Sequence, residues 1–211
     1  MDVGLKYFDP KIGVVKDFLG EKSEYMIGGN YTSTKINSTI DELWLATTEG
    51  VSRVNKNTGK NVLYLVGDGR NYIRARDIIE GENGQFWVAT QGAGLAKIQT
   101  FPNSWKIETT YYSVEHGFPQ NELSSLSKNG DLIWLTGTNI VISFNSKTLE
   151  VLTYPSLLNM NDLSFTGSSS SINDNVLYIG SNQGLVELDL TGINKNNIHS
   201  ALEFTQIKAG Q

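Results

Sequence analysis

Cysteine is absent from this 211-residue chain, histidine occurs twice and proline four times. The absence of cysteine excludes disulfides, thiolate nucleophiles and metal sites with sulfur ligands. The two histidines, His116 and His199, lie 83 residues apart without a carboxylate at ligand spacing, so no metal site is expected. There is no nucleophile elbow and no dinucleotide-binding glycine motif followed by a helix, so neither a catalytic residue nor a cofactor is predicted.

Clustered positive charge and long apolar runs are also missing. The formal net charge is −5, and no run of Lys and Arg is longer than a pair. Nucleic-acid binding needs clustered cations to neutralise phosphates, so it is not expected. No run of about 18 apolar residues occurs, so we expect no membrane contact by this part of the chain.

The sequence does contain one segment that is repeated four times. The copies are LWLATTEGVSRV, FWVATQGAGLAKI, IWLTGTNIVISF and LYIGSNQGLVEL, and their aromatic residues are Trp44, Trp87, Trp134 and Tyr178. These aromatic residues follow one another at intervals of 43, 47 and 44 residues. A period of about 45 residues with short alternating strands in each unit is typical of a β-propeller. We therefore predict an all-β fold, with no segment of helical periodicity.

The period sets the expected organisation of the chain. We predict a β-propeller fragment at residues 1–200, with a half blade at 1–19 and four complete four-stranded blades at 20–66, 67–113, 114–154 and 155–200. The first residues are similar to the second half of a repeat, and we therefore expect this chain to be an excerpt of a longer protein. Because four and a half blades do not close a ring, the exposed blade faces are expected to meet the remaining blades of the parent chain or a second copy in a homodimer.

Each unit also has a turn residue that is expected to adopt positive φ between the second and third strands. Gly50, Gly94 and Gly184 occupy this place in three units, and Asn139 occupies it in the remaining one. Glycine has no Cβ to clash in this region, and asparagine tolerates it better than other residues do.

The four aromatic residues have two possible roles. They could form a stacking platform for sugars or aromatic ligands, or they could be structural anchors that pack between neighbouring sheets. Their strict period and apolar neighbours favour the structural role.

These segments resemble the two-component regulator propeller repeats. GENGQFWVATQGAGLAKI and DELWLATTEGVSRVNKNTGK are similar to the core of that repeat, and HGFPQNELSSL is similar to its lead-in. LYIGSNQGLVELDLTGINKN resembles the last blade of the family, in which Tyr replaces Trp. Residues 201–211 resemble the first strand of a following immunoglobulin-like domain, although they could instead be a closing strand.

The resemblance implies a periplasmic, non-enzymatic, ligand-sensing module of a transmembrane signalling protein whose output is a histidine kinase or a diguanylate cyclase. Two alternatives stay open. One is an enzyme similar to the streptogramin-lyase propellers, which would need a histidine and an acid converging on one face. The other is a scaffold that docks a partner protein. His116 is expected to be solvated or to cap a turn rather than to act in catalysis.

The candidate ligand site is predicted from position. The first strand of each propeller blade lines the central channel, and Arg74 and Arg76 alternate on one face of such a strand. Arginine suits bidentate recognition of carboxylate or sulfate. We expect an anionic or polyhydroxylated small molecule there, unless the arginines are exposed strand-end charges or pair with Asp77 or Glu122. The candidate site residues are Tyr31, Arg74, Arg76, Asn121 and Glu122.

Overall fold

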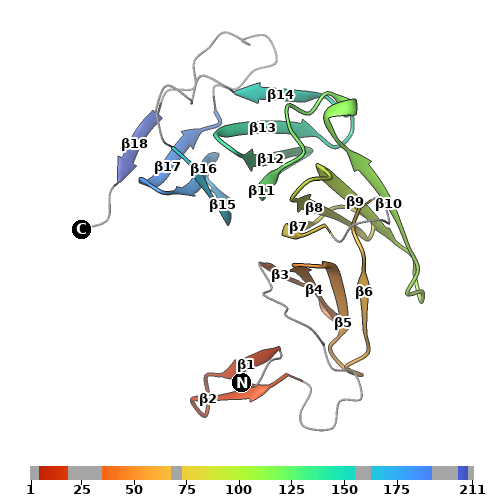
Figure 1. Cartoon of the computed structure of the whole chain (residues 1–211). Coiled ribbons are helices and arrows are strands. Elements are labelled where there is room, and N and C mark those ends of the chain that lie inside the picture. Colours follow the sequence, from red (N-terminus) through yellow and green to blue (C-terminus); the bar gives the residue numbers. More distant parts are fainter. Residues whose placement is uncertain (1–4, 19–34, 68–72, 155–162, 192–203, 209–211) are drawn as a thin grey trace.

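The computed structural model describes residues 5–18, 35–67, 73–154, 163–191 and 204–208, and β-strands are almost all of the regular secondary structure in these residues (Figure 1). The one helical element among them is a single 3-10 turn, η1 (Val114–His116). None of the described helical segments is long and apolar enough to cross a membrane. The predicted all-β class is therefore confirmed.

The strands form one two-stranded sheet and four four-stranded sheets, which we call blades 1 to 4. The two-stranded sheet contains β1 (Lys6–Asp9) and β2 (Val14–Asp17). Blade 1 contains β3 (Lys35–Ser38), β4 (Glu42–Thr47), β5 (Gly50–Asn55) and β6 (Asn61–Tyr64). Blade 2 contains β7 (Ala75–Glu80), β8 (Gln85–Thr90), β9 (Leu95–Thr100) and β10 (Ile107–Tyr112). Blade 3 contains β11 (Leu123–Asn129), β12 (Leu132–Gly137), β13 (Ile140–Asn145) and β14 (Val151–Tyr154). Blade 4 contains β15 (Phe165–Asn173), β16 (Val176–Ser181), β17 (Gly184–Asp189) and β18 (Phe204–Lys208).

Within each blade every strand pairs antiparallel with the strand before it, so each blade is a meander. The first strands, β3, β7, β11 and β15, lie nearest the centre, and the blades follow one another along an arc (Figure 1). The two-stranded sheet lies beside blade 1, where Leu5 and Phe18 pack against Leu43, Leu45 and Val54. This arrangement confirms the predicted propeller with four complete blades and one partial blade.

The segment after blade 4 contributes to the sheet. β18 pairs with β17, with Leu185 opposite Lys208 and Val186 opposite Ile207. In this structure residues 204–208 are therefore the outer strand of blade 4. The blade boundaries, and the assignment of residues 201–211 to a following immunoglobulin-like domain, stay predictions.

The tryptophans are core residues that join one blade to the next. Trp44 is fully buried and packs against Ile78 and Phe86 of blade 2. Trp87 likewise packs against blade 3, and Trp134 against blade 4. Tyr178 occupies the equivalent position on β16 but is only half-buried, because no described blade follows blade 4 to cover it. The core interpretation therefore holds for the three tryptophans and only partly for the tyrosine.

A second aromatic residue accompanies each buried tryptophan. Tyr64, Tyr112 and Tyr154 lie at the ends of the outer strands β6, β10 and β14. Their ring centroids lie 6.1, 5.9 and 5.4 Å from those of Trp44, Trp87 and Trp134, respectively. Each pair adds offset or tilted ring contacts to the core of its blade. The aromatic period did not predict these tyrosines.

The predicted turn conformations are confirmed. Gly50, Gly94 and Gly184 have φ values of 138°, 77° and 125°, and Asn139 has a φ of 53°. At Gly50 and Gly94 there is a second requirement, because a Cβ would lie 2.2 Å from the carbonyl oxygen of Tyr64 or Tyr112. These glycines therefore also allow the outer strand to approach the turn.

Polar contacts join the inner strands of neighbouring blades. Asp77 on β7 is fully buried, and its carboxylate accepts hydrogen bonds from the backbone N–H of Ile78 (2.7 Å) and of Leu126 in blade 3 (2.9 Å). Ser127 and Ser170 link blades 3 and 4 through their hydroxyls at 2.9 Å. The Asp77 contact includes an ionisable group, so we expect it to stabilise the interface more than the Ser127 contact does.

Replacing Asp77 with alanine is expected to lower the free energy of unfolding by about 1–2 kcal/mol, because it leaves buried N–H groups without an acceptor. Asp77→Asn retains one amide oxygen and should cost less. Urea melts of both variants, with Ser127→Ala as the control for a neutral interblade contact, measure the difference. If Asp77→Ala unfolds at the wild-type midpoint, the carboxylate does not hold blades 2 and 3 together.

Candidate ligand site at the channel rim

The inner strands of blades 2, 3 and 4 are interrupted at the same level. The strand register shifts between Ala75 and Asp77 in β7, and between Leu123 and Ser125 in β11. A longer interruption separates Phe165 from Ser170 in β15. A bulge bends its strand and redirects the side chain of the extra residue. In β7 that residue is Arg76.

Arg76 is half-buried and extends toward blade 4. Its Nη1 atom lies 3.9 Å from the place that a Cβ on Gly167 would occupy, and the carbonyl oxygen of Ser124 lies equally close to that place. The guanidinium therefore lies where β7, β11 and β15 converge. Gly167 leaves room that any larger residue would partly fill.

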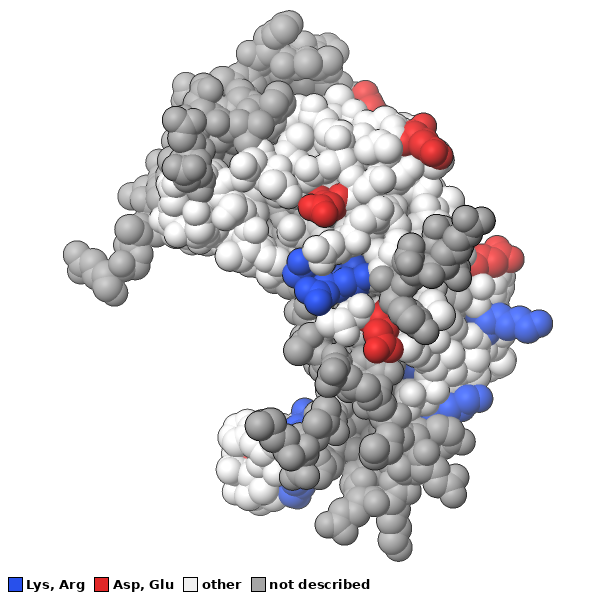
Figure 2. Space-filling view, viewed as in Figure 1, with Lys and Arg blue, Asp and Glu red and all other residues white. Residues whose placement is uncertain are grey.

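The charges around Arg76 are mixed. Burial lowers the pKa of Arg76 below its usual value, the positive charge of Arg74 lowers it further, and Glu122 opposes both effects. Arg74 itself is exposed. In Figure 2 basic side chains gather on the inner side of the arc, with acidic side chains nearby. The structure thus brings Arg74, Arg76 and Glu122 close enough to interact electrostatically.

Asn121 organises the rim through both of its oxygen atoms. Its carbonyl oxygen accepts hydrogen bonds from the N–H groups of Gly92 (3.1 Å) and Gly94 (2.9 Å) in blade 2. Its Oδ1 atom accepts a hydrogen bond from Val114 N–H at 2.9 Å. Because Oδ1 already serves η1, a ligand contact from this side chain would have to come from Nδ2. The predicted role of Asn121 in binding stays a prediction.

Two residues named in the sequence analysis, Tyr31 and His199, lie outside the described residues. The Asp77 carboxylate accepts hydrogen bonds from the two backbone amides described above, and the alternative in which an arginine pairs with Asp77 or Glu122 stays open. Ala75 packs in the core shared by blades 1 and 2, whereas the Asp77 carboxylate accepts a hydrogen bond from blade 3, so the bulge at Arg76 interrupts the regular alternation of β7. The prediction that Arg74 and Arg76 share one face of a strand therefore stays a prediction.

Comparisons with known proteins identify the architecture. No family model and no curated protein matches the sequence. Among solved structures, the extracellular domain of BT4673 from B. thetaiotaomicron, described as a one component system, has a TM-score of 0.59 and 18% identity over 82% of this chain and 23% of that chain. The extracellular domain of BT3049 from the same organism, described as a hybrid two component system, has a TM-score of 0.57 and 15% identity over 82% of this chain and 23% of that one. Saccharomyces cerevisiae Sqt1 has a TM-score of 0.57 and 12% identity over 90% of this chain and 54% of its own.

This chain has a β-propeller fold. At these sequence identities the likeness shows the fold alone, and the chain spans about a quarter of the length of the two bacterial domains. Because β7, β11 and β15 are the inner strands of their blades, their bulges lie in the channel wall, and Arg76 is the candidate residue at one of them.

His116 has a structural role in the propeller. Its Nδ1 atom accepts a hydrogen bond from the backbone N–H of Ser113 at 3.2 Å, and the Ser113 side chain in turn caps η1. The expected turn-capping role is therefore confirmed. Among the residues that the structure describes, no group of three His, Cys, Asp or Glu side chains is placed to hold a metal ion.

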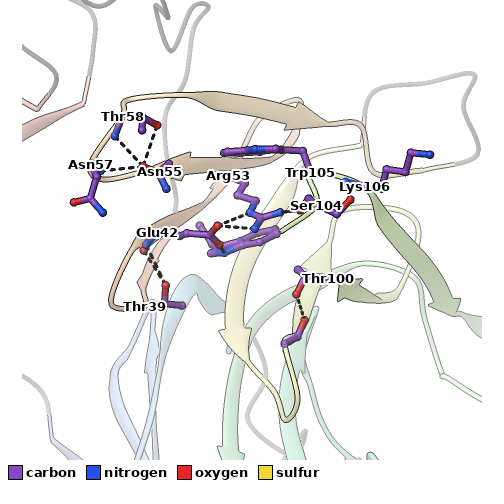
Figure 3. A network of polar contacts seen from close by, with 12 residues as sticks. Thr39, Glu42, Arg53, Asn55, Asn57, Thr58, Thr100, Ser104, Trp105 and Lys106 are labelled. Carbon is purple, nitrogen blue, oxygen red and sulfur yellow. Dashed lines mark hydrogen bonds and ion pairs between the residues drawn. The ribbon is translucent and has the colours of Figure 1, made fainter. Parts of the chain in front are cut away.

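A polar network between blades 1 and 2 was not predicted (Figure 3). Arg53 donates to Oε1 of Glu42 from Nε (2.8 Å) and Nη2 (2.5 Å), and from Nη1 to the carbonyl oxygen of Ser104 in blade 2 (2.7 Å). Its guanidinium lies between two indole rings, 5.4 Å from the Trp44 centroid and 4.7 Å from that of Trp105. The Trp44 indole N–H donates to Oε2 of Glu42 at 3.1 Å.

Burial alone would lower the pKa of Arg53, but hydrogen bonds to Glu42 and Tyr64, with their charges, hold that pKa above its usual value. The Tyr64 hydroxyl donates to the carbonyl oxygen of Trp105 at 2.6 Å. Trp105 lies in the turn 101–106, outside the four repeated segments, so the period gave no signal for it. The network belongs to the interface between blades rather than to the channel.

Proposed function

We propose that this chain is part of the extracytoplasmic ligand-sensing propeller of a transmembrane signalling protein, with a histidine kinase or diguanylate cyclase as output. The proposal is supported by the likeness to extracellular domains of bacterial signalling systems and by the resemblance of the repeats to two-component regulator propellers. On this proposal the region is periplasmic and acts by binding rather than by catalysis.

The proposed binding site is supported mainly by one observation: a bulge in the channel wall places the guanidinium of Arg76 where three blades converge. A partly buried guanidinium interacts more strongly with an anion than an exposed one does, because water screens it less. Arginine also offers paired donors for a carboxylate or sulfate group. Exposed Arg74 and Glu122 add the mixed polar groups that fix a small ligand in orientation. The ligand class is therefore an anionic or polyhydroxylated small molecule.

The enzyme alternative has weaker support. A lyase-type mechanism needs a histidine as general base or acid close to its partner acid. His116 is exposed and engaged at the N-terminus of η1 through Nδ1. A sensory binding module needs no such pair, and we therefore prefer it.

The Arg76→Ala variant of the full-length protein is expected to lose its ligand-dependent response, because its partly buried cation is removed. The response would be read from a transcriptional or second-messenger reporter during exposure to glucuronate, N-acetylneuraminate, sulfate and neutral disaccharides. Arg76→Lys should respond weakly, since lysine keeps the charge but not the paired donors.

Lys106→Ala is the control, because Lys106 is an exposed cation in the outer turn of blade 2. Both variants should melt close to the wild-type temperature. A normal response by Arg76→Ala to a compound that activates the wild type would contradict the site. A response of the wild type to none of these compounds would count against the proposed ligand class.

A further inference from the structure

A cavity of about 210 Å³ lies between blades 2 and 3, at the opposite end of β7 from Arg76. Blade 2 lines it with Gln85, Trp87 and Lys97, and the turn before β8 adds Glu82. Blade 3 contributes Lys128 and Lys147. A sulfate ion or a small carboxylic acid fits within this volume.

The cavity concentrates positive charge on a chain whose formal net charge is −5. One of its three lysines, Lys147, forms an ion pair with Glu82 at 2.6 Å. That hydrogen bond and the charge of Lys147 lower the pKa of the Glu82 carboxyl, and Lys128 contributes to the same shift. The Lys97 ammonium lies 5.8 Å from the Trp87 ring centroid. Within the described ranges, neither Lys97 nor Lys128 is in an ion pair.

Blade 1 shows how an anion is bound at the corresponding place. There Arg53 lies directly opposite Trp44 across the β4–β5 pair, and Glu42 precedes Trp44 by two residues. The Glu42 carboxylate binds both the Arg53 guanidinium and the Trp44 indole N–H. This position of the blade therefore binds a carboxylate between a cation and an indole.

Blade 2 keeps the cation and the indole but has no carboxylate at the position two residues before the tryptophan. Lys97 lies directly opposite Trp87 across the β8–β9 pair, as Arg53 does opposite Trp44. Gln85 precedes Trp87 by two residues and is neutral where blade 1 has Glu42. The cavity lies beside Lys97, and blade 3 adds a second cation, Lys128, to its lining. Glu82, the carboxylate of blade 2 in this lining, is paired with Lys147.

We propose that this cavity binds a small molecule bearing a carboxylate or sulfate group, which occupies the place that the Glu42 carboxylate holds in blade 1. Lys97 and Lys128 contact the anionic group from the two blades, and the amide of Gln85 donates a hydrogen bond to it. Such a ligand bridges blades 2 and 3 and stabilises their interface. The site is separate from the channel rim and does not depend on the proposed sensory function.

The most direct test places a carboxylate in the cavity by substituting a residue of blade 2. The Gln85→Glu variant gives blade 2 the residue that blade 1 has, so it should fill the site and remove anion binding. Isothermal titration calorimetry and thermal melts of the 211-residue chain would be measured with sodium sulfate and with sodium glucuronate, against sodium chloride at equal ionic strength. Sulfate also stabilises proteins by exclusion from their surface, so the informative quantity is the difference from wild type.

Wild type is expected to show saturable binding of at least one of the two probes, and Gln85→Glu should show none. Lys128→Gln should weaken the affinity at least tenfold, and Lys106→Gln, which removes an exposed cation elsewhere, should leave it unchanged. Saturation by sulfate alone, or by glucuronate alone, distinguishes an inorganic oxyanion from a sugar acid as the preferred ligand. Wild type without saturable binding of either probe, or binding that Gln85→Glu retains, would overturn the proposal.

Discussion

Trp87→Ala is expected to lower the free energy of unfolding by about 3–5 kcal/mol, because it opens a large cavity between two blades. Trp87 is 2% exposed, and its ring lies 5.6 Å from Phe144 of blade 3 and 5.9 Å from Tyr112, between centroids. Removing the indole therefore loses contacts within blade 2 and across the interface with blade 3. Urea denaturation followed by circular dichroism measures the change.

Tyr178→Ala is the matched control for this experiment. Tyr178 occupies the same position in blade 4, but it is half-buried. Its removal should cost about 1–2 kcal/mol, since less apolar surface is returned to water. If Trp87→Ala and the wild type share one midpoint, Trp87 is not a core residue, and its possible role in binding aromatic or sugar ligands would have to be reconsidered.

The contrast between Trp87 and Tyr178 shows what the sequence could predict. The aromatic period is a local signal, and it identified the strand, the repeat and the number of complete blades. Burial depends on whether another blade follows, and this is a property of the assembled arc. The turn residues were easier to predict: positive φ at Asn139 follows from its place in the repeat, because the backbone requirement is local.

The channel rim illustrates the same limit. The prediction that Arg74 and Arg76 share one strand face rests on regular alternation, which the bulge at Arg76 interrupts. The bulge at Arg76 left no signal in the residue pattern, because it exists only relative to the register of β8. The hydrogen bonds that Asn121 accepts from Gly94 and Val114 could not be predicted from the sequence either, since they join segments that are separated along the chain.

The two interblade sites became visible only when the repeats were compared in register. Glu42 and Gln85 occupy the same position of the repeat. The effect of this difference depends on the cations that lie opposite the two tryptophans: Arg53 opposite Trp44, and Lys97 opposite Trp87. Trp105 was missed because it lies in an irregular turn and contacts the preceding blade. Repeats therefore predict the shared scaffold well, and the positions where one repeat departs from another are where individual sites arise.

The network between blades 1 and 2 should contribute strongly to stability. Arg53→Ala is expected to lower the free energy of unfolding by about 2–4 kcal/mol, because it leaves the Glu42 carboxylate without its partner. The two side chains are 11% and 20% exposed, so solvent screens their pairing less than it screens a surface ion pair. The substitution also removes the contacts of the guanidinium with the rings of Trp44 and Trp105.

A double-mutant cycle with Arg53→Ala and Trp105→Ala separates the ring contact from the ion pair. We expect a coupling of about 0.5–2 kcal/mol between the two sites, since the rings enclose a partly desolvated cation. Lys97→Ala is the matched control, because Lys97 lies opposite its tryptophan, and within the described residues it forms no ion pair and contacts no second ring. It should cost less than about 1 kcal/mol. Equal losses for Arg53→Ala and Lys97→Ala, or additive effects in the cycle, would mean that the Glu42–Arg53–Trp105 arrangement does not hold blade 1 to blade 2.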